Sequence, residues 1–111
     1  MSNTIKIYDF TESSVAETME LGDKVFNSIK PLIENSMKSD MKIVLDFSGI
    51  TSLTTKFLNN AIGNLFLTLD AKKLLTLLNF TGLDQAKKTT LKWSLSVALA
   101  NSTANKQLNN D

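Results

Sequence analysis

The most informative pattern of hydrophobic and polar positions lies in the middle of the chain, where Ile43 to Phe66 reads IVLDFSGITSLTTKFLNNAIGNLF. Ile43-Val44-Leu45 is apolar on both faces, as expected of a central strand in a parallel sheet. The residues from Ser48 to Thr55 are rich in Gly, Ser and Thr and predict a turn. From Lys56 to Leu69, apolar residues recur at helical spacing and predict an amphipathic helix. Its buried stripe would be Phe57, Leu58, Ala61, Ile62, Leu65, Phe66 and Leu69.

Three elements are predicted before this segment. Residues Thr4 to Phe10 alternate partly and predict a half-buried strand at a sheet edge. Ser14 to Glu17 has a capping-box pattern, which predicts a short helix that stops at Gly22. A longer helix follows, kinked at Pro31, up to the connection Ser39-Asp40. Its inward-facing residues would be Val25, Phe26, Ile29, Leu32, Ile33 and Met37.

The remaining elements continue the alternation of strand and helix. Leu74 to Leu78 predicts a second buried strand, and the capping box from Thr81 to Asp84 predicts a helix that runs to about Ala100. This order predicts an α/β fold with one small, mainly parallel sheet flanked by helices. Residues 1–100 would form the domain, and residues 101–111 would form a polar, frayed C-terminal tail.

Length and charge narrow the class of protein. A chain of 111 residues with 42% hydrophobic and 21% charged residues is typical of one globular domain. The net charge of +1 favours neither nucleic acid nor an anionic membrane as a partner. The N-terminus has no signal-peptide pattern, and the apolar runs are far shorter than the roughly 20 residues of a membrane span. We therefore expect a cytoplasmic protein.

The chain has no histidine, no cysteine and no arginine, since all twelve basic residues are lysine. These absences exclude the usual zinc sites, a disulfide framework and a Ser-His-Asp or Cys-His relay. The carboxylates Asp9, Asp46, Asp70 and Asp84 form no evident acid/base pair in the sequence. We expect no enzyme, no metal site and no cofactor.

Five hydroxyl residues lie in the turn before the middle helix: Ser48, Thr51, Ser52, Thr54 and Thr55. They lie where backbone N–H groups and the helix dipole favour an anion, so a docking or phosphate-receptive loop is one interpretation. The other is that Thr54 or Thr55 caps the helix while the remaining hydroxyls complete turns. No Gly-rich phosphate motif accompanies them.

Asp46 is the only charge in its apolar strand, and a buried carboxylate without partners would be costly. We expect a structural role, as an acceptor for N–H or hydroxyl groups of the following turn. A catalytic or metal-binding role would need a second carboxylate, and the sequence fixes none nearby.

Asn59, Asn60, Gly63 and Asn64 form an uncharged polar face on the middle helix. Because Asn and Gly are poor helix formers, this face predicts a surface that another molecule approaches closely. The alternative is compositional, since the chain contains eleven asparagines. A smaller patch of Lys87, Lys88, Lys92 and Trp93 is typical of a solvated helix face and has too little charge for nucleic-acid binding.

The segment LDFSGITSLTTKFLNNAIG resembles the core of STAS-like domains, relatives of the anti-sigma factor antagonist (STAS) fold. More narrowly, it is similar to a bacterial STAS-like group of unknown function. In that group, a Leu-Asp-Phe strand and a small turn are followed by a helix that begins with Phe and contains a Gly. Leu45, Asp46, Phe47, Phe57 and Gly63 match these positions. The resemblance extends over roughly Thr4 to Ala100.

The resemblance implies a non-enzymatic switch module. STAS antagonists use the turn and the following helix to bind an anti-sigma factor kinase of the histidine-kinase-like ATPase superfamily. Their Asp-Ser-Ser-Gly motif falls here on Thr54, Thr55, Lys56 and Phe57. Thr55 therefore occupies the phosphoacceptor position, while Thr54 replaces the Asp and Phe57 the Gly. The implied partner-binding residues are Ser52, Thr54, Thr55, Lys56, Asn59, Asn60, Gly63 and Asn64.

Two other functions stay open at the level of the sequence. Some STAS domains are thought to bind nucleotide, so a nucleotide or small-anion binder is the main alternative. An enzyme would need a pocket that brings two carboxylates together with a lysine. The protein would be a monomer, or a weak homodimer if the N-terminal strand has an open edge.

Overall fold

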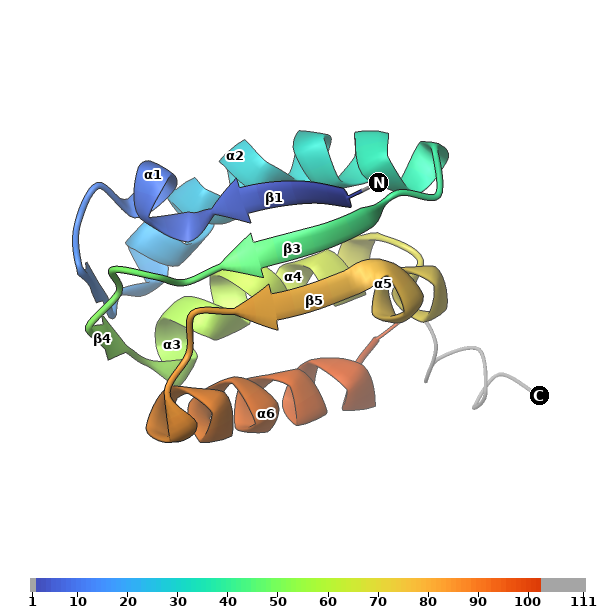
Figure 1. Cartoon of the computed structure of the whole chain (residues 1–111). Helices are drawn as coiled ribbons and strands as arrows, with labels where there is room; N and C mark the ends of the chain where they lie inside the picture. Colours follow the sequence, from blue (N-terminus) through green and yellow to red (C-terminus); the bar gives the residue numbers. More distant parts are fainter. Residues whose placement is uncertain (1, 103–111) are drawn as a thin grey trace.

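The computed structural model of the chain describes residues 2–102 and shows a single α/β domain (Figure 1). Three parallel strands form the main sheet in the order β1-β3-β5, and a second pair of parallel strands joins β2 to β4. The strands are β1 (Ser2–Lys6), β2 (Val15–Ala16), β3 (Lys42–Asp46), β4 (Ser52–Leu53) and β5 (Leu78–Thr81). The predicted fold class is confirmed: small parallel sheets are flanked by helices.

Within residues 2–102, seven helical segments connect and cover these strands. They are α1 (Ile7–Thr11), α2 (Met19–Lys38), α3 (Thr55–Leu58), η1 (Asn59–Gly63), α4 (Asn64–Thr68), α5 (Ala71–Leu77) and α6 (Gln85–Ala100). The segments α3, η1 and α4 follow one another without a break, and we call them together the central helix. It agrees with the predicted helix to within one residue at each end. Phe57, Leu58, Ala61, Ile62, Leu65 and Phe66 are buried, as predicted, and Leu69 is partly buried.

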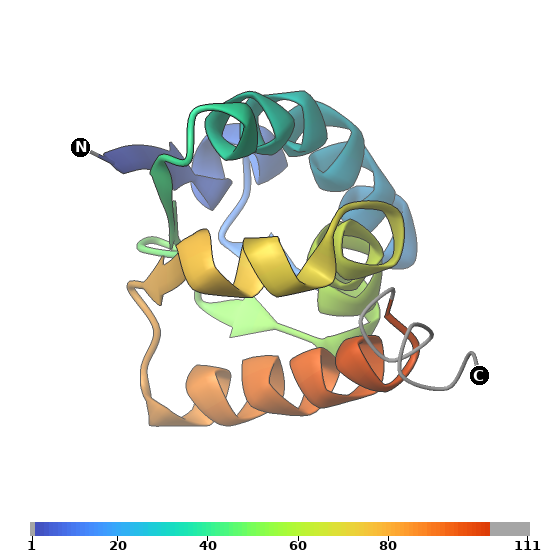
Figure 2. The ribbon, with the colours of Figure 1, turned by 90° about the vertical axis from the view of Figure 1, so that its right-hand side faces the viewer.

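The helices α2, α4 and α6 lie on one side of the main sheet, as Figure 2 shows. Strand β3 is the central strand, but only one of its faces is covered. Ile43 and Leu45 are fully buried, whereas Val44 on the opposite face is only partly buried. The expectation that both faces are covered is therefore wrong. The open face carries mostly polar residues: Thr4, Lys6, Lys42, Val44, Asp46, Asn79 and Thr81.

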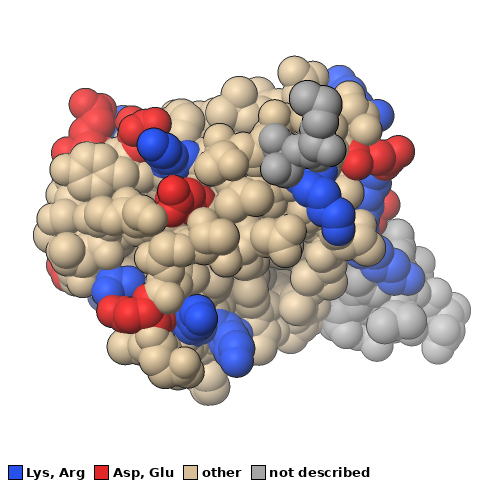
Figure 3. Space-filling model, in the orientation of Figure 1, with Lys and Arg blue, Asp and Glu red and all other residues tan. Residues whose placement is uncertain are grey.

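A polar face can remain in water, so this sheet needs no second layer of helices. Figure 3 views the molecule from the same direction as Figure 1, with the sheet in front of the helices. Acidic and basic side chains are scattered over this side and do not gather into one patch of a single sign. The distribution agrees with the near-zero net charge of the chain.

The first predicted strand is correct only in its first half. β1 ends at Lys6, and Ile7–Thr11 forms the short helix α1, although Thr4 to Phe10 was expected to be extended. Ile7 and Thr11 are both buried and lie four residues apart, which is the spacing of a helix. Strand β1 does lie at the edge of the sheet, as predicted.

The predicted short helix after Ser14 is also wrong. Val15 and Ala16 form β2, which pairs with β4, and the first turn of α2 is capped by Thr18, whose hydroxyl accepts from Leu21 N at 3.1 Å. Gly22 does not stop a helix but lies within α2. A Cβ at Gly22 would lie 2.6 Å from the carbonyl oxygen of Phe57. Position 22 therefore requires glycine, because the backbone of the central helix passes too close for a side chain.

Of the segment predicted as a strand, Leu74 to Leu78, only Leu78 is part of one. Asp70 caps the helix α5, in which Leu74 and Leu77 are buried while Leu75 is 47% exposed. The strand β5 begins only at Leu78. An apolar run of five residues fits either structure, and the cap at Asp70 together with the burial of every third residue favours the helix.

The long helices differ from prediction in smaller ways. α2 continues through Pro31, whose exposed position leaves the missing hydrogen bond facing water. Leu32 was expected to be buried but is 45% exposed. The cap of α6 is Asp84, which accepts from Lys87 N at 2.9 Å, rather than Thr81.

The predicted tail, residues 101–111, lies outside the described residues apart from Asn101 and the buried Ser102. Within residues 2–102, every helix is too short or too polar to span a lipid bilayer.

Two helical glycines provide a test of the close contact between α2 and the central helix. Alanine normally stabilises a helix relative to glycine by about 1 kcal/mol. At Gly22 we expect the opposite, a loss of about 1–3 kcal/mol in Gly22→Ala, because the new methyl group would overlap the Phe57 carbonyl. Gly63→Ala is the matched control, since its Cβ would lie 3.6 Å from Ala98 Cβ, an ordinary contact.

Urea denaturation measures both changes in the free energy of unfolding. Gly63→Ala should be neutral or stabilising. Equal stability of Gly22→Ala and the wild type would show that the two helices are not held as closely as the structure indicates.

Candidate functional site

The turn that follows β3 is organised by one carboxylate. Asp46 Oδ1 accepts hydrogen bonds from Ser48 N at 2.9 Å and from Ser48 Oγ at 2.7 Å. Gly82 packs against the same turn with a φ of +76°, and a Cβ there would lie 2.5 Å from Ser48 N. The carboxylate of Asp46 is therefore engaged by the turn, and the residue opposite it must be glycine.

These contacts change the acidity of Asp46. The hydrogen bonds from the side chain and backbone of Ser48 lower the pKa of the Asp46 carboxyl, and Lys6 and Thr81 lower it further against the opposing effect of partial burial. Asp46 is thus held in its ionised form, in which it can only accept hydrogen bonds.

The next part of the turn is fixed by the segment that precedes α2. Thr51 N donates to Ser14 O at 2.8 Å, and the Ser52 hydroxyl donates to the carboxylate of Glu17. The hydroxyl of Thr54 donates to Glu17 O at 2.7 Å and accepts from Phe57 N at 3.2 Å, which caps α3. The hydroxyls of Ser52 and Thr54 are therefore used inside the protein.

Thr55 and Lys56 are the more available residues of the predicted docking turn. Thr55 is the first residue of α3 and is partly buried, and its hydroxyl makes no hydrogen bond to the other described residues. Lys56 is exposed and lines a shallow hollow with four residues of the segment that leads into α2. These four are Glu17, Thr18, Met19 and Glu20.

The predicted polar face of the central helix lies between two neighbouring helices. Asn59 Oδ1 accepts from Ser94 Oγ of α6 at 2.6 Å, while Asn60 Nδ2 donates to Asp23 of α2 at 3.0 Å. Gly63 is buried. The face is therefore recessed between α2 and α6 and is not a freely solvated helix surface.

The backbone of this face is irregular. Asn59–Gly63 forms one π-helical turn, in which Asn64 N bonds to Asn59 O, five residues earlier. Turns of this kind inside α-helices are often found at functional sites. The amide of Asn64 also donates to Asn60 O at 3.1 Å. The extra residue widens the helix at the point where the candidate side chains lie.

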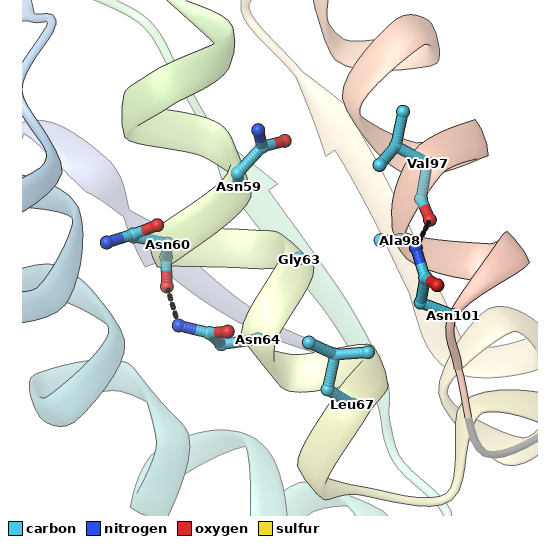
Figure 4. A pocket seen from close by; sticks show the side chains of 8 residues that line it. All are labelled: Asn59, Asn60, Gly63, Asn64, Leu67, Val97, Ala98 and Asn101. Carbon is cyan, nitrogen blue, oxygen red and sulfur yellow. Dashed lines mark hydrogen bonds between the residues drawn. The ribbon is translucent and has the colours of Figure 1, made fainter.

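The four residues of the face line a groove between the central helix and α6 (Figure 4). Its volume is about 210 Å³, and it is lined by Asn59, Asn60, Gly63, Asn64, Leu67, Val97, Ala98 and Asn101. In Figure 4, Gly63 and Leu67 lie on the side of the central helix toward α6, whereas Asn60 and Asn64 point toward α2. None of the lining residues is charged.

The half of this groove that α6 contributes was not predicted from the sequence. Val97 and Leu67 are 45% and 41% exposed, so the groove presents apolar as well as polar side chains. The only signal in the sequence was the uncharged stretch WSLSVALANS, from Trp93 to Ser102. Within residues 2–102, no three His, Cys, Asp or Glu side chains come close enough to hold a metal ion.

Comparison with known proteins identifies the family. A family model described as the STAS-like domain of unknown function (DUF4325) matches residues 22–88, which is more than half of the chain. The chain therefore belongs to this family, and the resemblance predicted from its central segment is confirmed. No curated protein and no solved structure matches the chain.

The pKa of Asp46 gives a test of the organised turn. Because this pKa is lowered in the folded state, ionised Asp46 stabilises the fold above the unfolded-state pKa of about 3.9, and the contribution is lost as pH falls through the folded pKa. The free energy of unfolding should therefore differ most between wild type and Asp46→Asn near neutral pH, and the difference should shrink in acid.

An NMR titration of the carboxyl of Asp46 provides the direct measurement. Ser48→Ala removes the largest cause of the shift, so the pKa should rise toward its ordinary value. An unchanged pKa in Ser48→Ala would contradict the assignment of this hydrogen bond as the cause.

Proposed function

We propose that this member of the STAS-like family is a cytoplasmic, non-enzymatic regulatory module that docks on a partner protein. The docking face would consist of the exposed end of the turn and the recessed polar face of the central helix, namely Ser52, Thr54, Thr55, Lys56, Asn59, Asn60, Gly63 and Asn64. The observation that carries the proposal is the groove, because all four residues of the helix face line one uncharged hollow.

The physical character of this face suits protein recognition. The turn is held by hydrogen bonds to Ser14 and Glu17, so little ordering would be needed on binding. The groove part of this face carries no charge and contains Gly63, so another backbone can approach it closely. By the resemblance to anti-sigma factor antagonists, the partner is a histidine-kinase-like ATPase or an anti-sigma regulator.

The structure gives less support to a nucleotide or small-anion site at the turn. The hydroxyls of Ser52 and Thr54 are already bonded within the protein, and Glu17 and Glu20 lie beside Lys56. Acidic side chains at this end of α3 would repel a phosphate. We expect calorimetric titrations with ATP and GTP to show no binding, and a measurable heat of binding would favour the alternative.

Affinity capture from the source organism, with mass spectrometry to identify histidine-kinase-like ATPases, tests the docking face. Asn64→Arg adds a charge to the docking face, and Lys56→Glu reverses one, at positions that are not fully buried. We expect each variant to form a complex that is at least about tenfold weaker. Gly63→Arg is less suitable, because Gly63 is buried next to Ala98 and the variant could unfold. Asn35→Arg, on the β1 side of α2, is the matched control.

Isothermal titration with the purified ATPase then measures the affinities. If both charged variants bind it as tightly as Asn35→Arg and the wild type do, this face is not the docking surface.

Phosphorylation of Thr55 is a separate part of the hypothesis. Thr55→Ala tests it apart from docking through the groove, because this variant removes the acceptor hydroxyl without adding charge to the docking face. A phosphate there would add about −1.5 to −2 charge, which favours the start of α3 but repels an acidic partner surface. Thr55→Glu should therefore bind an acidic partner more weakly than Thr55→Ala, as measured by the same titration.

A further inference from the structure

The C-terminal half of α6 presents an exposed surface that the proposed docking function does not explain. From Trp93 to Ser102 the chain carries no charged residue, although surface helices usually carry charge on their outer face. Trp93, the only tryptophan of the chain, is 68% exposed, and Val97 one turn later is 45% exposed. Tryptophan is enriched at the centre of protein–protein interfaces, where it often contributes most of the binding energy.

The same helix also provides a hollow next to this tryptophan. Val97, Ala98 and Asn101 line the groove described above, opposite Gly63 and Leu67 (Figure 4). Its volume of about 210 Å³ is below the range of roughly 300–1,000 Å³ for ligand pockets, so it suits one large side chain better than a whole ligand.

A protruding side chain and a hollow thus lie on the same flank of α6. Trp93 precedes Val97 and Asn101 by four and eight residues, or roughly 6 and 12 Å along the helix axis. A two-fold axis near Ser96 would place two α6 helices antiparallel and bring the Trp93 of each copy over the hollow of the other. Such a reciprocal contact is the defining property of a symmetric dimer interface.

We propose that a second copy of this chain occupies the groove, through antiparallel packing of α6 against α6 with Trp93 inserted beside Val97. The exposed residues near the axis are small, Ser96 and Ala100, so the two helices can approach closely. Because this half of α6 has no charge, the two identical surfaces meet without like-charge repulsion.

The dimer would share part of its surface with the docking face. Asn59, Gly63 and Asn64 line the groove that Trp93 of the second copy enters, so the second copy and the regulatory partner would exclude one another. The dimer itself does not depend on the identity of that partner. An experiment on the isolated protein therefore tests the dimer separately from the proposed docking function.

Sedimentation equilibrium of the full chain, from micromolar to millimolar concentration, measures the association. We expect a reversible monomer–dimer equilibrium, with a blue shift of the Trp93 fluorescence as the dimer forms. Trp93→Ala should raise the dissociation constant about thirtyfold, which corresponds to the loss of a hot spot of about 2 kcal/mol. Lys92→Ala, the matched control next to Trp93 on the other flank, should leave the equilibrium unchanged.

Ser96 tests the position of the two-fold axis. Ser96→Lys and Ser96→Glu each place like charges at the axis and should be monomeric alone, while an equimolar mixture of the two should form heterodimers. A wild type that stays monomeric at millimolar concentration overturns the proposal. A dimer that is unaffected by Trp93→Ala and by both Ser96 variants overturns it equally, because it would use another surface.

Discussion

The close approach of α2 to the central helix at Gly22 is the constraint on which the rest of the structure depends. No side chain separates the two backbones there, since a Cβ would lie 2.6 Å from Phe57 O and 2.9 Å from Asn60 Cβ. Thr18 caps α2 one turn before this contact, and Glu17 binds Ser52 and Thr54 just before the cap. One steric contact therefore fixes the helix, the turn and the candidate face relative to one another.

This arrangement explains how the polar groups of the candidate turn are used. Asp46 is engaged by Ser48, and the Thr54 hydroxyl is engaged by Glu17 and the backbone of α3. These polar groups therefore hold the turn in place. The surface that remains available consists of an uncharged groove, a π-helical turn and a few exposed apolar side chains, and these features support the proposed docking function.

Elements with a long, regular period could be predicted from the sequence, and short ones could not. The central helix was predicted because its apolar stripe repeats over four turns. Thr4 to Phe10 and Leu74 to Leu78 were predicted as strands, yet both overlap short helices, Ile7–Thr11 and Ala71–Leu77, because five to seven residues contain too little periodicity to distinguish a helix from a strand. Strand β2 is two residues long and exists only because Ser52 and Leu53 lie beside it.

The sequence by itself determined the family, the parallel α/β class, and the grouping of Asn59, Asn60, Gly63 and Asn64 on one helix face, because these depend on local order and period. Only the tertiary structure decided which groups of other helices lie opposite those four residues. The groove needs Val97 and Ala98 from α6, and the recessed position of Asn60 needs Asp23 from α2. Contacts between residues more than thirty positions apart depend on how the helices pack on one side of the sheet, and no local pattern carries that information.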